Sequence, residues 1–376
     1  MGRKQHISVL GRFVETVDRA EMLPQGAKVL VAVSGGADSV CLFDLLRSVA
    51  PGRGIELVGF HMNHRLRPTA YRDEMFVRDL FGSVPLVVVR ADVVGYARRH
   101  RLGIEEAGRE LRYRHMVGIA RKRGCSLVAL GHTADDNLET MLLNLARGAG
   151  LTGLAGVPVR RGIFIRPLID IERTEIVAYL RARGLTWVED ESNQNAHFRR
   201  NLVRLTAVPA LKAVNPRAAV SARRTAELLS EEDSFLDGLA REALNHVATV
   251  RRGRVCVDCA AFRLYDICLR RRMARQLLPG LDSVNLSRAV EFLAPGPDAT
   301  LKLNRFVRLI RRSVTPRRPT GVSCRQSAAL PLDLRAVLAQ DRACGVVSDS
   351  GSSSAGAGCE TVVTVVGSGR PVSVHG

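Results

Sequence analysis

The 376-residue chain is short of acidic residues and of long apolar runs. It carries 37 Asp and Glu against 56 Lys and Arg, a formal net charge of +19. Such an excess of positive charge indicates a polyanionic partner, either nucleic acid or a membrane surface. No apolar run approaches the roughly 18 residues of a membrane-spanning helix, and the N-terminal residues lack the apolar core of a signal peptide. We therefore expect a cytoplasmic protein that has no membrane partner.

The sequence also lacks internal repeats and a second Cys-x-x-Cys pair. Its eight cysteines are scattered, and in a reducing compartment thiols are expected in place of disulfides. Cys256 and Cys259 form a single Cys-x-x-Cys pair, to which Cys268 would add a third ligand. Because no second pair completes a four-cysteine site, we interpret the three as core thiols, with an iron–sulfur cluster or zinc as the alternative.

Short apolar runs alternate with amphipathic segments from Lys28 to about Arg183. The runs are KVLVAV, ELVGFHM, PLVVVRA, SLVALGH and IFIRPL, and helices are expected near 39–50, 71–81, 105–123, 135–147 and 172–183. This alternation predicts an α/β fold, a parallel sheet with helices on both faces. Ligands of such sheets bind at the carboxyl ends of the strands, so the residues after each run are the functional candidates.

The composition changes beyond residue 200. Strand signals become rare, and residues 251–318 hold sixteen Arg and Lys against five Asp and Glu. From about Pro319 the chain includes SDSGSSSAGAG, a composition too poor in apolar residues to order itself. We predict an α/β domain over 1–200, a mainly helical, basic domain over 201–318, and a divergent, partly disordered tail over 319–376.

A glycine-rich loop follows the first apolar run. Its residues are Ser34, Gly35, Gly36, Ala37, Asp38 and Ser39. A strand that opens into such a loop and then a helix gathers backbone N–H groups and the positive helix end at one point, which predicts an anion site. It is not the GxxxxGK[ST] loop, because no lysine follows the glycines. Asp38 would repel a phosphate unless a cation lay between them, which predicts Mg²⁺.

A second acidic strand end lies in GHTADDNLET. Asp136 and Glu139 are three residues apart, so on a helix they share a face near its first turn. The alternative is an ordinary N-cap formed by Thr133 and Asp136. Together with Asp38 at another strand end, the pair favours a metal site.

Two further segments carry basic and aromatic side chains near the predicted strand ends. The segment HMNHRLRP contains His61, His64, Arg65 and Arg67. We predict nucleotide or phosphate contacts there, with a polar loop that caps the sheet as the alternative. The segment EEAGRELRYRHM places Glu105, Arg109, Arg112 and Tyr113 at helical spacing. A solvated helix with salt bridges would have the same pattern.

Taken in order, these segments resemble a known family. SGGADS, HMNHRLR, the ExxGRxxRY segment of 105–113, GHTADDNLET, RGAGLTGLAG, RPL and WVEDESNQNAHFRRNLVR are similar to the tRNA(Ile)-lysidine synthetases, which are PP-loop N-type ATP pyrophosphatases. The resemblance covers about residues 10–315, and the loop alone is shared with thiolases and GMP synthetase. The chain departs from the family at Gly108, where alanine is usual, at the inserted Arg72, and from Pro319 onward.

The resemblance implies a Rossmann-like PP-loop ATPase fold and a two-step reaction. ATP adenylates the C2 oxygen of the wobble cytidine in the CAU anticodon of tRNA(Ile). The amine of L-lysine then attacks C2 and expels AMP, which leaves lysidine. The implied cofactors are ATP and Mg²⁺, the implied partners are tRNA(Ile) and L-lysine, and a homodimer is one expected assembly.

The resemblance also implies roles for individual residues. The pyrophosphate of ATP would lie on Ser34, Gly35, Gly36, Ala37, Asp38 and Ser39. Mg²⁺ would be bound by Asp38, Asp136 and Glu139, of which the last two would also bind lysine, while Arg112 and His132 would stabilise charge. Contacts to tRNA would come from His64, Arg67, Arg199, Arg200, Asn201, Arg204, Arg270, Arg271 and Arg272. Because lysine is protonated at pH 7, its attack requires a proton acceptor or a lowered pKa.

Two other functions remain open at this stage. A PP-loop tRNA thiolase would share the adenylation step, and Cys256 with Cys259 would then hold its cluster. An RNA-binding protein without catalysis would not need Asp38, Asp136 and Glu139.

Overall fold

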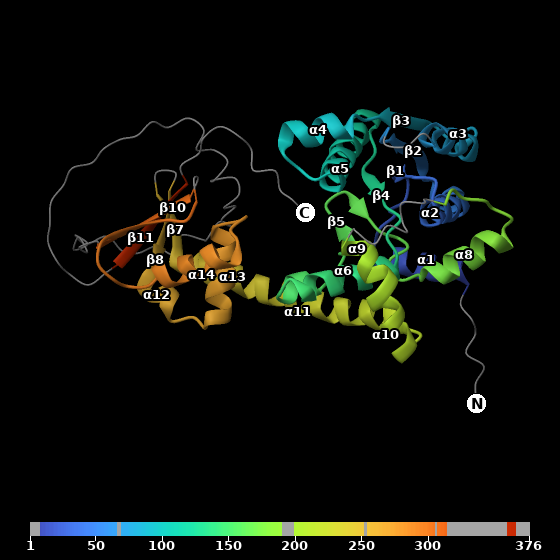
Figure 1. Ribbon diagram of the computed structural model, residues 1–376. Coiled ribbons are helices and arrows are strands. Elements are labelled where there is room, and N and C mark those ends of the chain that lie inside the picture. The colour runs from blue at the N-terminus through green and yellow to red at the C-terminus, as the bar shows by residue number, and fades with distance from the viewer. Residues whose placement is uncertain are drawn as a thin grey trace. The chain divides into compact units, whose positions relative to one another are not determined.

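The computed structural model describes residues 8–65, 69–189, 199–251, 254–304 and 307–313, and the backbone of 359–365 (Figure 1). The chain divides into two compact units, Met1–Glu231 and Glu232–Gly376. No helix within the described ranges is both long and apolar enough to cross a membrane.

The first unit is built on a six-stranded sheet. Its strands are β1 (Lys28–Ala32), β2 (Glu56–Asn63), β3 (Leu86–Arg90), β4 (Leu127–Ala129), β5 (Arg160–Arg161) and β6 (Phe164–Ile165). Its helices up to residue 182 are α1 (Val9–Arg19), α2 (Ala37–Val49), a 3₁₀ turn (Pro51–Arg53), α3 (Ala70–Phe81), α4 (Val93–His100), α5 (Ile104–Arg123), α6 (Ala134–Ala146), α7 (Leu151–Leu154) and α8 (Arg173–Ala182).

The strand order β3-β2-β1-β4-β6-β5 confirms the predicted fold class. Neighbouring strands from β3 to β6 are parallel, and only β5 runs antiparallel, as an edge hairpin with β6. The five helices expected from periodicity all form, each within two residues of its predicted ends. The chain leaves β1 toward β2 and returns to β4 on its other side, so the carboxyl ends of β1 and β4 flank the topological switch point, where ligands bind in such sheets.

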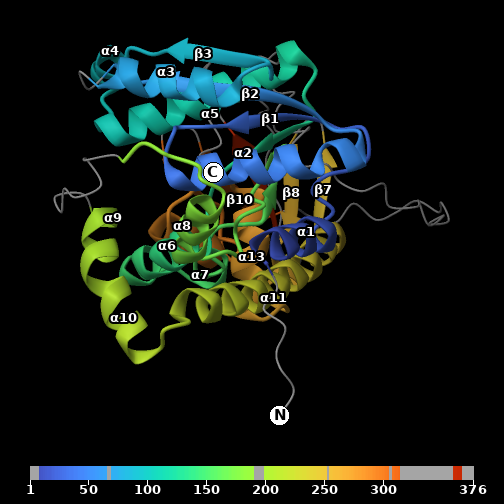
Figure 2. The same cartoon turned by 90° about the vertical axis from the view of Figure 1, so that its right-hand side faces the viewer.

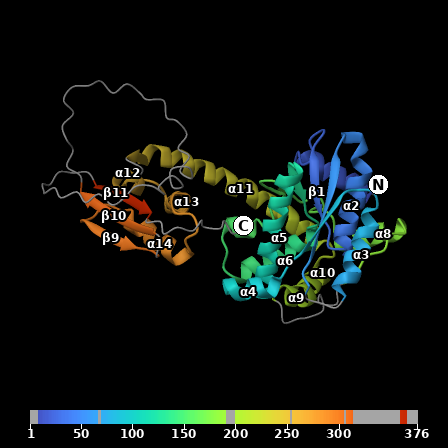
Figure 3. The same cartoon turned by 90° about the horizontal axis from the view of Figure 1, so that it is seen from above.

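Helices cover both faces of this sheet, as Figure 3 shows with α2 on one side of β1 and α5 on the other. Val29 and Val31 of β1 pack in the cluster that contains α1, α2 and α8, whereas Leu30 packs in the cluster that contains α4 and α5. Successive strand residues point to opposite faces, so a continuous apolar run fills both layers.

Three helices after residue 198 also belong to the first unit. They are α9 (Arg199–Leu202), α10 (Val208–Val214) and the start of α11 (Ala218–Val247), with a π-helical turn over Val203–Ala207. Val208 and Ala219 pack against Ala134 and Leu138 of α6, and Figure 2 shows α9 and α10 beside α6. The units therefore separate after Glu231, within α11, and not at the change of composition near residue 200.

The second unit combines helices with a sheet. Its helices are α12 (Cys259–Arg263), α13 (Ile267–Leu277) and α14 (Ser283–Phe292), and its strands are β7 (Ala248–Arg251), β8 (Arg254–Asp258), β9 (Ala299–Lys302), β10 (Val307–Ser313) and β11 (Cys359–Val365). The helical part agrees with the prediction, but the antiparallel sheet, ordered β7-β8-β11-β10-β9, was not part of it. The strand β11 comes from the predicted tail, whose remaining residues lie outside the described ones.

Two glycines of the first unit give opposite expectations for substitution by alanine. A Cβ on Gly59 of β2 would lie 2.3 Å from the ring of buried Phe81, whereas one on Gly108 of α5 would meet its nearest atom, Nδ1 of His64, at 3.6 Å. We expect Gly59→Ala to destabilise the protein by about 2 kcal/mol through overpacking. Gly108→Ala should stabilise it by about 1 kcal/mol through helix propensity. Urea unfolding of both variants measures the two changes in the free energy of unfolding. If both variants were stabilised, or both destabilised, the packing described here would be contradicted.

Candidate active site

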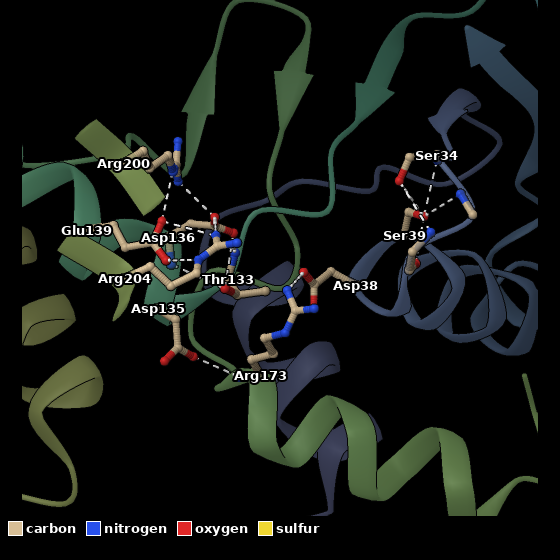
Figure 4. Close-up of polar contacts among 12 residues, drawn as sticks. Ser34, Asp38, Ser39, Thr133, Asp135, Asp136, Glu139, Arg173, Arg200 and Arg204 are labelled. Carbon is tan, nitrogen blue, oxygen red and sulfur yellow. Dashed lines mark hydrogen bonds and ion pairs between the residues drawn. The ribbon is translucent and has the colours of Figure 1, made fainter. Parts of the chain in front are cut away.

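The loop between β1 and α2 gathers donors around one oxygen. The backbone N–H groups of Ser34 and Gly35 each donate to Ser39 Oγ over 3.2 Å, and that hydroxyl donates to the Gly36 carbonyl over 2.8 Å (Figure 4). Gly35 has φ +98°, a conformation that L side chains rarely adopt. Together with the start of α2, these amides suit a negatively charged oxygen.

The chain after β4 can lie against the first turn of α2 because Gly131 has no side chain. A Cβ on Gly131 would lie 3.3 Å from the backbone carbonyl of Asp38 and 3.4 Å from Ser39 Cα. These are backbone atoms that cannot easily move away. Glycine at this position therefore allows the two strand ends to share one site.

Asp38 lies in that first turn with one oxygen paired and one not. Its Oδ2 accepts a hydrogen bond from Arg173 Nη1 at 3.1 Å, while Oδ1 is buried and has no hydrogen-bond partner among the described residues. Burial raises the pKa of Asp38 to about 6, and Arg173 only partly opposes this. A buried carboxylate oxygen without a donor is suited to a cation.

Asp136 and Glu139 lie on the first turns of α6, on the face that the spacing predicted. Asp136 Oδ2 accepts from the Thr133 N–H at 2.9 Å, and the Thr133 hydroxyl accepts from the Asp136 N–H, so these residues form a capping box. The predicted N-cap is thus present, and it uses only one oxygen of Asp136. Glu139 is 1% exposed.

Arg200 and Arg204 neutralise this acidic pair. Arg200 donates from Nη2 to Asp136 Oδ1 at 2.8 Å and from Nε to Glu139 Oε2 at 2.7 Å. Arg204 donates from Nε to Glu139 Oε1 at 2.6 Å and from Nη2 to Oε2 at 3.1 Å (Figure 4). Although burial alone would raise the pKa of Asp136, Arg200 and the other nearby donors hold it below its ordinary value.

Two other predicted residues are at the same sheet edge. His132 precedes the capping box, and burial lowers its pKa to about 4, so its imidazole is neutral at pH 7. Its Nδ1 is buried without a hydrogen-bond partner among the described residues. Arg112 of α5 lies with Nη2 3.4 Å from His64 Nε2.

The donor set fits a Mg²⁺ ion only in part. Asp38 offers a buried, unpaired oxygen, the type of ligand that Mg²⁺ prefers. Asp136 and Glu139 instead have their oxygens bound to Thr133, Arg200 and Arg204. Within the described ranges no group of three or more His, Cys, Asp or Glu side chains could hold a metal ion.

Three contributors to this site were not among the predicted residues. Arg173 pairs with Asp38 and donates its backbone N–H to Asp135 Oδ2 at 2.7 Å. Lys212 of α10 reaches Asp135 Oδ1 at 2.6 Å. Of these three, only Asp135 could have been identified from the sequence, because it is an acidic residue at the start of a predicted helix. Arg173 and Lys212 could not, because an arginine or lysine on a helix has the same sequence pattern whether it faces solvent or a buried acid.

The residues predicted to contact tRNA are found in different environments. Arg199 is exposed at the start of α9, and Asn201 is half-buried on the same helix. Arg67 and the middle of WVEDESNQNAHFRRNLVR, residues 190–198, lie outside the described residues.

The arginines of α13 also differ from one another. Arg271 is exposed and Arg270 is half-buried, but Arg272 is buried and donates to Asp233 Oδ1 and Asp237 Oδ1, each at 2.6 Å. Arg272 therefore binds acids of α11, and its guanidinium is not presented to a phosphate.

The three cysteines considered as metal ligands lie in the second unit. Cys256 and Cys259 are buried, and Cys268 is exposed. Cys256 belongs to β8, and Cys259 begins α12.

A family model described as a PP-loop domain matches residues 9–211, more than half of the chain. The chain belongs to the PP-loop family. Membership of this family of ATP-binding domains implies that the protein uses ATP, and residues 34–39 are the predicted PP-loop.

Curated relatives confirm the narrower resemblance to tRNA(Ile)-lysidine synthetases. The chain is 42% identical over 263 residues to the tRNA(Ile)-lysidine synthase of Geobacter sulfurreducens, covering 68% of this chain and 56% of that one. It is 32% identical over 311 residues to the tRNA(Ile)-lysidine synthase of Geobacillus kaustophilus, covering 78% and 67%. The chain spans about half to two thirds of the length of the curated relatives it matches.

A solved structure, a U34-tRNA thiolase from Methanococcus maripaludis with its [4Fe-4S] cluster, is a more distant neighbour. It has a TM-score of 0.49 and 19% identity, covering 59% of this chain and 78% of that one. A likeness at this level has no bearing on which reaction this chain catalyses.

The charge of Asp38 should oppose folding above pH 6 when no metal is bound. Because its folded pKa, about 6, exceeds the unfolded value of 3.8, its contribution to stability is fully present below pH 3.8 and is lost as the pH rises through 6. In a chelating buffer we expect Asp38→Asn to be more stable than the wild type by about 2 kcal/mol at pH 8. Urea unfolding at several pH values should show this advantage shrinking from pH 6 downward, and an advantage equal at pH 5 and pH 8 would disprove the assignment.

Replacement of a buried arginine of the second unit should lower stability, whereas replacement of an exposed one should change only the binding of tRNA. Arg272→Ala leaves two acids of α11 without their partner, which we expect to cost about 3 kcal/mol of stability. Arg271→Ala and Arg308→Ala remove exposed side chains, so stability should change by less than about 0.5 kcal/mol. If they contact phosphates, each should lower the slope of log affinity for tRNA against log salt by about 0.7–0.9. Thermal unfolding and salt titrations measure both effects, and a fully stable Arg272→Ala protein would contradict the buried ion pair.

Proposed function

We propose that the protein joins L-lysine to C2 of the wobble cytidine in the CAU anticodon of tRNA(Ile), through an adenylated tRNA, with release of pyrophosphate and AMP. The observation that carries this proposal is the placement of an anion-binding loop after β1 next to a cation-binding acid pair after β4. The first suits the phosphates of ATP, and the second suits an ammonium group. The lysidine synthase relatives support the same reaction.

In the first step, the PP-loop amides and the start of α2 hold the phosphates of ATP. Asp38 would hold Mg²⁺, which, when bound, neutralises phosphate charge next to a carboxylate. The raised pKa of Asp38 reflects burial without a cation, and a bound cation would favour its charged form. Arg173 keeps the second oxygen of Asp38 oriented.

In the second step, the lysine amine must reach C2 in its neutral form. Asp136 and Glu139 already bind two guanidinium groups, so they suit the ammonium of lysine as it enters. Both are poor bases while they are so paired. The neutral imidazole of His132 has an unpaired buried nitrogen, and we assign to it a hydrogen bond with the attacking amine or with the group that forms at C2.

Substrate tRNA accounts for the basic surface of the chain. Arg199 on α9 and Arg271 on α13 are exposed, and the net charge of +19 favours a polyanion. We infer that the protein acts in the cytoplasm, where tRNA is modified. A homodimer stays a prediction. Sulfur transfer is less well supported than lysine ligation, because Cys256 and Cys259 are buried in the second unit.

The proposed reaction predicts that label from lysine enters one tRNA species. Wild-type protein incubated with ATP, labelled lysine and total bacterial tRNA should label tRNA(Ile) with a CAU anticodon and release one AMP per lysine incorporated. Asp38→Asn should lose at least about 100-fold in rate, because it would no longer hold the Mg²⁺ that neutralises the charge of the phosphates. Its affinity for tRNA should stay within about twofold. Asp18→Asn, at an exposed carboxylate of α1, is the matched control.

Glu139→Gln separates the two steps. We expect it to keep tRNA-dependent exchange between ATP and pyrophosphate and to lose lysine transfer, so adenylated tRNA should accumulate. Labelling of other tRNAs, or ATP hydrolysis by Asp38→Asn at the wild-type rate, would rule out the proposed function.

A further inference from the structure

A fully buried carboxylate lies beside the candidate site without taking part in it. Glu74 of α3 is 0% exposed. Arg90, the last residue of β3, donates to both its oxygens, from Nε to Oε2 at 3.1 Å and from Nη2 to Oε1 at 2.9 Å. Arg78 adds a hydrogen bond from Nη2 to Oε1 at 3.0 Å. Such a forked, charge-assisted arrangement is rigid.

Asn63 links this ion cluster to the end of β2. Its Nδ2 donates to Glu74 Oε2 at 3.0 Å and to the Ala70 carbonyl at 3.1 Å. In the sheet, Asn63 is the register partner of Arg90, and both donate to the same oxygen of Glu74. The amide orientation of Asn63 is therefore determined, with Nδ2 toward the acid and Oδ1 toward the chain that follows.

That Oδ1 holds an unusual backbone conformation in place. It accepts the N–H of Arg65 at 2.9 Å, and Arg65 has φ +54°, in the left-handed region that favours glycine. An L residue in this conformation costs about 1 kcal/mol or more, so a partner must hold it there. The chain offers no glycine at this position, although glycine would adopt the turn without assistance.

The turn places two side chains at the carboxyl edge of the sheet. The guanidinium of Arg65 is exposed, and His64 Nε2 lies 3.4 Å from Arg112 Nη2. The helix α5 also packs close to His64, since a Cβ on Gly108 would make ordinary contact with Nδ1 at 3.6 Å. Asn63 thus holds the backbone of Arg65, and through it the turn that carries both side chains.

We propose that Asn63 and Glu74 are positioning residues for tRNA, which hold the His64–Arg65 turn so that an imidazole and a guanidinium meet the RNA backbone near the reacting base. The choice of tRNA as the ligand rests on the proposed function. The loop at residues 34–39, to which we assign the phosphates of ATP, follows the neighbouring strand β1. Its hydrogen bonds described above involve Gly36, Ser39 and Arg173, and not Asn63, Arg65 or Glu74. Removal of Asn63 should therefore weaken tRNA binding and leave ATP binding unchanged.

The test is a double-mutant cycle on the full-length protein. Asn63→Ala should raise the Kd for tRNA, measured by anisotropy, and the KM for tRNA by about tenfold, as expected when one charge-assisted hydrogen bond to the RNA is removed. The Kd for ATP and kcat should stay within about twofold. Arg65→Gly removes the side chain but adopts the turn by itself, so adding Asn63→Ala to it should cause less than a twofold further change.

Asp44→Asn is the matched control for a loss of stability alone. Asp44 is a buried carboxylate of α2, paired with Tyr179 Oη at 2.7 Å and remote from the turn in sequence. It should lower the melting temperature and leave the affinity for tRNA unchanged. Three results would each overturn the proposal: an unchanged Kd for tRNA in Asn63→Ala, an equal loss of ATP affinity, or an Asn63→Ala effect that persists undiminished in the Arg65→Gly background.

The Kd for tRNA can be measured without turnover, so the proposed function and the role of Asn63 are tested by independent measurements. A wild-type protein that binds tRNA but forms no lysidine would disprove the reaction and still allow the turn to be tested.

Discussion

The acidic pair of α6 has to be neutralised because it is buried, and this requirement organises the first unit. Glu139 is 1% exposed, and an unpaired charge in such a place would cost several kcal/mol. The neutralising guanidinium groups come from Arg200 and Arg204, more than 60 residues later in the chain. The segment that carries them is thereby held on α6, where Val208 and Ala219 add apolar contacts. The residues up to Glu231 therefore belong to the first unit, although their composition resembles the region that follows.

The same pairing restricts which ligands can enter. A cation that approaches Asp136 or Glu139 must replace a guanidinium, and it does so at little cost only if it brings equal charge and the displaced arginine finds another anion. On the proposed function both conditions are met, since lysine carries an ammonium and ATP with tRNA supplies phosphates. A site built in this way would discriminate against neutral amino acids without a dedicated steric filter.

Much of this site could be predicted from the sequence because its signals are local. The hydrophobic period placed the helices, the loop at residues 34–39 predicted donors around an anion, and Thr133 with Asp136 predicted a cap that is present. The partners of the acids could not be predicted, since nothing local distinguishes Arg173 or Lys212 from a solvated side chain. The sheet of the second unit was missed for a similar reason. Its strand β11 joins β8 and β10 from about 50 residues beyond β10, and no pattern within a short window reports such a pairing.

The positive charge of the chain is also not all surface charge. Arg223 lies at 7% exposure on Asp170, and Arg272 binds Asp233 and Asp237. Arg311 donates to the carbonyls of Phe292 and Ala294 at the end of α14, so it completes a helix terminus that would otherwise leave acceptors unsatisfied. An arginine with such an internal partner would have to give up a short hydrogen bond to reach a phosphate. The number of counterions released on binding RNA is therefore limited to the basic side chains that are exposed, and it is smaller than the count of basic residues implies.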